Sequence, residues 1–271
     1  MSTQKITSME VAKLAGVSQS AVSRVFTPGA SSSKKTNELV RKAAAELGYR
    51  PNVLARSLIT GKSRMIGLVV AYLDNYFYPE ALELLSSALQ KKGYHVLIFM
   101  SGNKEGDIAD AVDEILDYQV DGIIAASVSM SSDLAKRCTS AGVPVVLFNR
   151  TQDDDRLSAV TSDNFQGGQK VARFLLAGGH KRIGYIAGWE GASTQRDREK
   201  GFTEELVRNG QELYAREVGN FNSDEARQAA RTMFSKQNFP DAVFVANDAM
   251  AIAVIDVIRF ELGLQVPEQV S

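Results

Sequence analysis

The chain has 271 residues, of which 44% are hydrophobic and 23% are charged, and its net charge at pH 7 is −1. This composition is typical of a globular protein, and no apolar run approaches the ~18 residues of a membrane span or forms the core of an N-terminal signal peptide. The single cysteine, Cys138, excludes an internal disulfide and fits a reducing, cytoplasmic compartment.

The first 26 residues predict two short helices joined by a tight turn. Thr7 and Glu10 have the spacing of a capping box at the start of the first helix. Gly16 ends that helix, and Ser18 has a side chain suited to cap the next one. Apolar residues recur at helical spacing, and we expect them to be buried: Val11, Leu14, Ala15, Ala21, Val22 and Val25.

The second helix carries short polar or forked side chains between its apolar positions: Gln19, Ser20, Ser23 and Arg24. Such side chains reach base edges in the major groove of DNA, which admits a helix. Helix-turn-helix proteins use the N-terminal end of their second helix in this way. The pattern therefore favours a DNA-reading helix over the alternative, a polar face on an ordinary helix pair.

A third helix is expected to begin after Ser33 and to end at Gly48. Its predicted buried stripe is Leu39, Val40, Ala43, Ala44 and Leu47. Residues 1–62 hold ten Lys or Arg and three Asp or Glu, whereas residues 63–271 hold 21 basic and 29 acidic residues. This separation of charge suggests a basic nucleic-acid-binding module joined to a body that does not bind polyanions.

Strand-like and helical segments alternate through the rest of the chain. Strands are predicted at 65–71, 94–100, 122–126, 143–148, 182–187 and 242–246. Helices are predicted at 79–92, 107–118, 132–141, 165–177, 196–209, 223–235 and 249–262. This alternation predicts parallel βαβ units in doubly wound sheets. Because the pattern repeats after residue 160, we expect two lobes with a ligand cleft at the carboxyl ends of their strands.

Four segments resemble the lactose-repressor (LacI/GalR) family of bacterial transcription regulators: EVAKLAGVS at 10–18, VSRV at 22–25, AAELGYRPN at 44–52 and LARSL at 54–58. The resemblance implies an all-α helix-turn-helix head at 1–50, a hinge helix and linker at 51–63, and an effector-binding and dimerisation domain at 64–271. That domain would be an α/β, two-lobed, periplasmic-binding-protein-like fold, with an N-lobe at about 64–157 and a C-lobe at about 158–271.

The resemblance also assigns roles in DNA binding. Base contacts are implied for Gln19, Ser20 and Arg24, and phosphate contacts for Ser18 and Ser23. Leu58 would wedge into the minor groove beside Ala55, and the cost of unstacking would be offset by contacts to the bent DNA. The full set of candidate DNA-binding residues is Thr7, Ser18, Gln19, Ser20, Ser23, Arg24, Asn52, Ala55 and Leu58.

Side chains near the predicted strand ends are the candidates for effector binding. Arg198 matches an arginine that holds ligands in the family, and its planar fork allows bidentate contacts. The full set is Phe77, Tyr78, Ser127, Asp163, Thr194, Arg198 and Asn247. Asn149 stands where the family usually has an aspartate, which removes a negative charge from the cleft. Each of these residues has an alternative, purely structural role, in helix capping or in packing.

The sequence predicts a transcriptional regulator of the repressor type that binds a palindromic DNA operator as a homodimer or tetramer. Its effector would be a small molecule such as a sugar, sugar acid or sugar phosphate, and no membrane, metal or cofactor is implied. A small-molecule-binding protein without specific DNA reading stays open, as does a sugar or nucleotide enzyme, although no phosphate loop or acid/base pair favours an enzyme. Because family members continue beyond Ser271, we also expect a fragment that lacks the C-terminal crossover.

Overall fold

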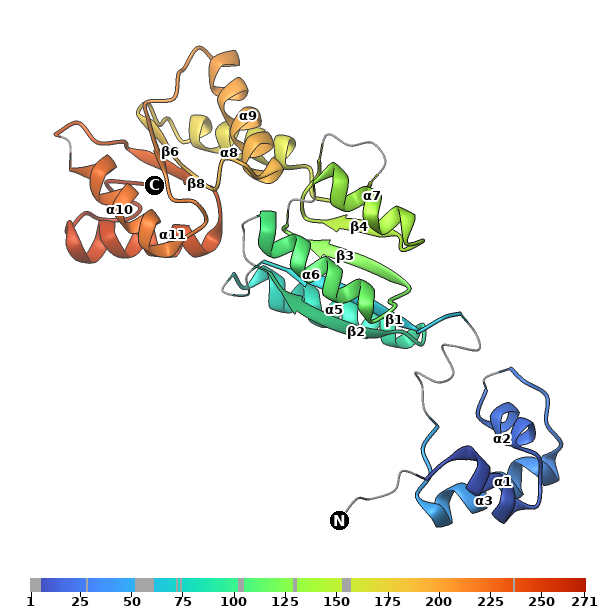
Figure 1. Cartoon of the computed structure of the whole chain (residues 1–271). Helices are drawn as coiled ribbons and strands as arrows, with labels where there is room; N and C mark the ends of the chain where they lie inside the picture. Colours follow the sequence, from blue (N-terminus) through green and yellow to red (C-terminus); the bar gives the residue numbers. More distant parts are fainter. Residues whose placement is uncertain are drawn as a thin grey trace. The chain divides into compact units, whose positions relative to one another are not determined.

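The structure, a computed structural model, describes residues 6–27, 29–51, 61–71, 73, 75–101, 105–128, 131–152, 157–235 and 237–271. The chain divides into two compact units, residues 1–63 and 64–271, which are coloured from blue to red along the sequence in Figure 1. Three candidate DNA-binding residues, Asn52, Ala55 and Leu58, lie outside the described residues. No helix in the described part of the chain is long and apolar enough to cross a bilayer.

The first unit contains three helices, α1 (Ser8–Ala15), α2 (Gln19–Phe26) and α3 (Lys34–Leu47). The capping box of Thr7 and Glu10 is present at α1. Ser18 caps α2 and Ser33 caps α3, because their hydroxyl oxygens accept the backbone N–H of Ala21 and Thr36. These side-chain caps satisfy backbone groups that a helix leaves free at its N-terminus.

Two residues expected in the core of this unit are on its surface: Leu14 is 47% exposed and Leu39 is 42% exposed. The buried set is Val11, Ala12, Ala15, Val22, Val25, Val40, Ala43 and Ala44. The expectation for Leu14 was wrong because α1 buries Ala12 on its inner face instead. Three short helices enclose a small core, so each helix buries only a few side chains along one face.

The N-lobe contains a five-stranded parallel sheet with the order β2-β1-β3-β4-β5. Its strands are β1 (Met65–Val70), β2 (His95–Met100), β3 (Gly122–Ala126), β4 (Val145–Phe148) and β5 (Ser158–Val160). Leu82 of α5 (Phe77–Lys91) packs with Leu68 and Val70 on one face. Helices α6 (Glu105–Asp117) and α7 (Ser132–Ser140) pack with Val69 on the other.

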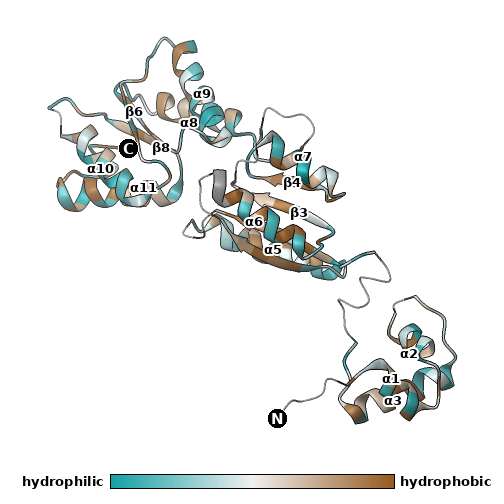
Figure 2. Ribbon diagram, in the orientation of Figure 1, coloured by the Kyte–Doolittle hydropathy of each residue, from teal (hydrophilic) through white to brown (hydrophobic). Residues whose placement is uncertain are grey.

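The C-lobe contains a three-stranded parallel sheet with the order β7-β6-β8. Its elements are α8 (Asn164–Ala177), β6 (Ile183–Ala187), α9 (Ser193–Arg208), β7 (Ala215–Val218), α10 (Ser223–Phe234), β8 (Ala242–Val245) and α11 (Asp248–Asp256), which continues as a π-helix, Val257–Glu261. Helices α8 and α9 lie beside one another, as do α10 and α11 (Figure 1). Figure 2 shows that helices in both lobes alternate between hydrophobic and hydrophilic residues.

The backbones of α8 and α9 approach closely at two glycines. A Cβ atom built on Gly168 would lie 2.1 Å from the carbonyl oxygen of Arg198, and one built on Gly201 would lie 2.0 Å from that of Phe165. Only a residue without a side chain fits at either position. Both glycines therefore fix where Arg198 lies relative to α8.

The predicted doubly wound α/β architecture is confirmed, but two strands were not predicted. All three residues of β5 are exposed, and β7 contains Arg216 and Glu217. Neither segment has the apolar run that identifies a buried strand. Because β5 pairs with β4, the first sheet extends to Val160, three residues beyond the expected lobe boundary at residue 157.

Candidate functional site

A cavity of about 350 Å³ lies in the second unit, where both parallel sheets end. Parallel strands of this kind place loops and helix N-termini at their carboxyl ends, the usual ligand position in such folds. Six of the seven predicted effector-binding residues line the cavity: Phe77, Tyr78, Ser127, Thr194, Arg198 and Asn247. They come from segments separated by up to 170 residues, which the two sheets bring together.

Arg198 is the single basic residue among the described residues that line the cavity. Its Nη1 donates a hydrogen bond to the carbonyl oxygen of Ala246, and its Nη2 donates to Asn164 Oδ1 over 2.6 Å. Burial lowers the pKa of the guanidinium, but an arginine stays protonated in proteins. The cavity therefore contains a partly desolvated positive charge with fixed orientation, which interacts strongly with an acceptor.

The N-lobe side of the cavity carries a polar cluster. The hydroxyls of Tyr78 and Ser127 are hydrogen-bonded to one another, and Asn149 Nδ2 donates to Tyr78 Oη over 2.9 Å. Beside them, the ring of Phe77 stacks on Phe148 with a centroid separation of 5.9 Å. This wall therefore offers hydroxyl and amide groups next to an aromatic face.

Three lining residues that are not glycine have left-handed backbone conformations. Their φ angles are 57° for Ser127, 64° for Asn149 and 58° for Phe221. Such conformations cost about 1–3 kcal/mol each and concentrate at ligand-binding sites. The protein thus loses some folding free energy at these three residues, whose side chains line the cavity.

Two contacts join the segment after β4 to the segment after β6. The Arg150 guanidinium lies 5.1 Å from the ring centroid of Trp189. The Thr151 backbone N–H donates to Ser193 Oγ over 2.8 Å. Because β4 belongs to one sheet and β6 to the other, these contacts connect the lobes directly beside Thr194.

The outer face of α2 in the first unit exposes all four polar residues predicted to read bases or hold phosphates: Gln19, Ser20, Ser23 and Arg24. Gln19 Nε2 donates to Ser8 Oγ over 2.9 Å, so this side chain is held against α1. Ser18 is also exposed, and its hydroxyl lies 2.9 Å from that of Ser20. Thr7 is exposed at the start of α1.

Residues 7–52 match the model of the bacterial regulatory proteins of the lacI family, and residues 66–261 match that of a periplasmic binding protein domain. The HTH-type transcriptional repressor PurR of Pasteurella multocida is 30% identical over 97% of this chain and 79% of its own length. The HTH-type transcriptional regulator CelR of Thermobifida fusca is 32% identical over 96% of this chain and 79% of its own length. The chain belongs to the LacI family.

Solved structures agree with this membership. The lac repressor dimer bound to operator and the anti-inducer ONPF has a TM-score of 0.88 and 28% identity, and the match covers 99% of this chain and 81% of that one. The CelR–cellobiose complex has a TM-score of 0.70 and 30% identity over 98% of this chain and 81% of that one. As a LacI-family protein, the chain is a DNA-binding, effector-controlled transcriptional regulator.

One of the predicted effector-binding residues, Asp163, lies at the start of helix α8. Asp163 is not among the described residues that line the cavity. It is the N-cap of α8, and its Oδ1 accepts the backbone N–H of Gln166 over 2.9 Å. The next residue, Asn164, lines the cavity and binds Arg198 instead.

Asn149, which the sequence placed at the cleft without a predicted contact, also lines the cavity. The lining residues that were not predicted are Asn75, Ser162, Asn164, Phe221, Phe244, Val245, Ala246 and Asp248. Asn164 and Asp248 directly follow predicted candidates, so a wider window around each strand end would have included them. Phe221 and Phe244 carry no such signal, because an apolar side chain in a core segment looks the same whether it contacts a neighbour or a ligand.

Proposed function

We propose that this chain is a cytoplasmic repressor that binds a pseudo-palindromic operator as a homodimer, under the control of a small molecule in the cavity. One observation carries the proposal: the side chains that α2 exposes are those suited to base edges. In this reading Gln19, Ser20 and Arg24 contact bases, while Ser18 and Ser23 contact phosphates. The basic surplus of residues 1–62 supplies affinity through counterion release.

The cavity chemistry favours a polyhydroxylated effector, such as a sugar, a sugar acid or a sugar phosphate. Hydroxyl, carboxylate and phosphate oxygens all accept hydrogen bonds from Arg198 and from asparagine amides. The aromatic faces of Phe77 and Tyr78 suit the apolar faces of a sugar ring. Among the relatives, CelR has been solved with cellobiose.

Selection of bound duplexes from a random DNA pool tests the function. We expect the selected sequences to share two related half-sites with two-fold symmetry, because a symmetric dimer presents two heads. A metabolite library is then screened for compounds that change the affinity for this duplex. Selected sequences without a common motif would contradict specific DNA reading, and turnover of a sugar or nucleotide would favour an enzyme.

Arg24→Ala is expected to weaken operator binding by ~1–3 kcal/mol and to relax specificity at a single base pair. The reason is that an arginine fork donates two hydrogen bonds to one guanine. Binding to operators with single base substitutions, measured at one fixed salt concentration, checks this. Lys13→Ala on α1 removes the same charge and serves as a control. If Arg24→Ala weakens binding to all sequences equally, Arg24 is a phosphate contact instead.

We further propose that the homodimer forms through α5 and the edge strand β2. Leu84 of α5 and Ile98 and Met100 of β2 are at least half exposed, and an edge strand with apolar side chains is a ready pairing surface. The related lac repressor is a dimer on its operator.

The double substitution Ile98→Glu and Met100→Glu is therefore expected to give a monomer of 29.5 kDa. It should also lower operator affinity by about 10²–10⁴-fold, which is the usual gain in affinity from joining two binding modules. Light scattering and operator titration measure the two effects. Phe174→Glu, at an exposed phenylalanine of α8, is the matched control and should leave the dimer intact. A double variant that stays dimeric would place the interface elsewhere.

A further inference from the structure

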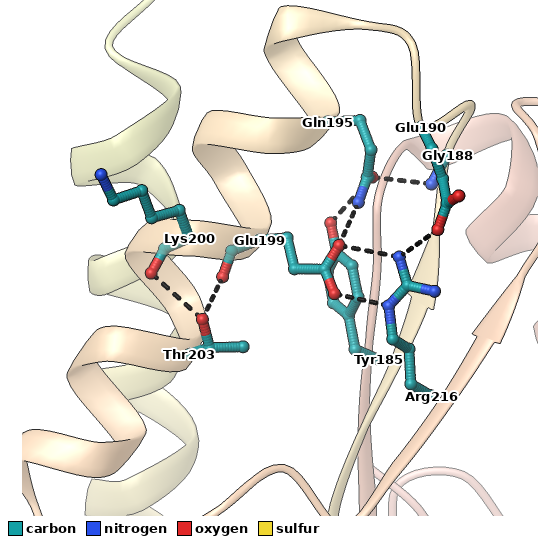
Figure 3. A network of polar contacts seen from close by, with 8 residues as sticks. All are labelled: Tyr185, Gly188, Glu190, Gln195, Glu199, Lys200, Thr203 and Arg216. Carbon is teal, nitrogen blue, oxygen red and sulfur yellow. Dashed lines mark hydrogen bonds and ion pairs between the residues drawn. The ribbon is translucent and has the colours of Figure 1, made fainter.

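A buried amide links the start of α9 to strand β6 (Figure 3). Gln195 is 1% exposed. Its Oε1 accepts hydrogen bonds from the Tyr185 hydroxyl over 2.9 Å and from the Gly188 backbone N–H over 2.7 Å. Its Nε2 donates to Glu199 Oε2 over 2.8 Å. One side chain thus connects α9 to the middle of β6 and to the residue that follows β6.

The network continues to strand β7 through Arg216 (Figure 3). Arg216 Nε donates to Glu199 Oε1 over 2.6 Å, and Nη2 donates to Glu199 Oε2 over 3.0 Å. Nη2 also donates to Glu190 Oε1, in the loop before α9, over 2.8 Å. These hydrogen bonds raise the pKa of Arg216. The Glu199 carboxylate is therefore held from the β7 side, which gives the Gln195 amide a fixed partner.

The N-terminus of α9 is joined to β6 by this network, and its N-cap residue makes no side-chain cap hydrogen bond. The N-cap residue is Ala192, which provides no side-chain acceptor for the free N–H groups there. Serine, threonine, aspartate or asparagine usually supplies that acceptor. Gln195, at the third helical position, accepts the Gly188 backbone N–H and so ties the first turn of α9 to the end of β6. An amide suits this position because its oxygen accepts two hydrogen bonds while its nitrogen donates.

We propose that Gln195 is a positioning residue for the effector cavity. It lies between Thr194 and Arg198, which line the cavity, and is not itself among the described lining residues. By fixing the first turn of α9, it places Arg198 where its guanidinium reaches both Ala246 and Asn164. The functional side of this inference rests on the proposed role of Arg198 in effector binding.

Nitrogen-15 relaxation of arginine side chains in the full chain tests the positioning without any effector. Gln195→Met keeps the length of the side chain and removes both polar atoms. We expect the order parameter of Arg198 Nε, whose signal is assigned by its loss in Arg198→Lys, to fall into the flexible range, below about 0.6. Arg173 binds Glu205 further along α9 with two hydrogen bonds, and its signal should not change.

A swapped pair provides the rescue. Gln195→Glu combined with Glu199→Gln retains one amide and one carboxylate, so Arg198 should regain part of its rigidity; the rescue is partial because the new amide nitrogen takes the place of the Glu199 Oε2 atom that accepts from Arg216 Nη2. Gln195→Glu alone places two carboxylates together and should leave Arg198 mobile, and this comparison serves even where Gln195→Met does not fold.

A rigid Arg198 in Gln195→Met would overturn the proposal. An equal loss of rigidity at Arg173 would overturn it too, because the whole helix would then have loosened. The effector assay is a separate readout. The effector is first identified with the wild-type chain, and Gln195→Met is expected to lower the affinity for that effector by at least tenfold. If Arg198 becomes mobile and effector affinity is unchanged, the positioning role stands and the proposed role of Arg198 in effector binding is wrong.

Discussion

Arg198→Met is expected to lower effector affinity by about 10–150-fold while operator affinity in the absence of effector stays unchanged. Two guanidinium nitrogens are held by Ala246 and Asn164, which orients the remaining N–H groups for a ligand. A hydrogen bond to a charged group contributes ~1.5–3 kcal/mol, which corresponds to that range of affinity. Calorimetric titration with the effector, and operator titration without it, measure the two quantities.

Two variants control this experiment. Arg198→Lys keeps the positive charge but has a single nitrogen, which cannot bridge two acceptors in the same fixed plane, so it should restore only part of the affinity. Arg173→Met removes an arginine that binds Glu205, and it should leave effector binding unchanged. Wild-type effector affinity in Arg198→Met would mean that the effector binds without this residue.

Gly201→Ala is expected to destabilise the second unit by about 3 kcal/mol, the upper end of the usual cost of overpacking. The added methyl group would lie 2.0 Å from the carbonyl oxygen of Phe165, and backbone has little freedom to move away. Gly168→Ala meets the carbonyl oxygen of Arg198 at 2.1 Å and should behave alike. Urea unfolding followed by circular dichroism measures the change.

Gly167 provides the matched control one residue away on α8. A methyl group there meets no atom within 4 Å, and alanine is the better helix former, so Gly167→Ala should stabilise the protein by roughly 0.4–1 kcal/mol. Equal unfolding midpoints for Gly167→Ala and Gly201→Ala would show that α8 and α9 do not approach closely in solution.

Local signals in the sequence predicted most helix boundaries. Ser18, Ser33 and Gly48 lie at the ends of their helices as expected, because capping and left-handed termination depend only on neighbouring residues. Leu14 shows the limit of such signals. Its spacing fits the buried stripe, but whether a side chain at the edge of a stripe is covered depends on helices distant in sequence.

The candidate site was predicted to a similar extent. Polar residues that follow buried strands were placed at the cavity because parallel strands end at one edge of their sheet. Asp163 follows the same rule, but its carboxylate caps α8. Phe221 could not have been found, since its contribution depends on a left-handed backbone conformation that short-range patterns do not reveal for a phenylalanine.

The contact between Arg150 and Trp189 gives the molecule an intrinsic optical probe. Trp189 is the chain's only tryptophan, and its indole faces a buried guanidinium from the other lobe at 5.1 Å. Indole emission responds to a charge at this distance. The fluorescence spectrum of the unlabelled protein should therefore report changes in the separation of the two lobes, and stopped-flow mixing would give their rate.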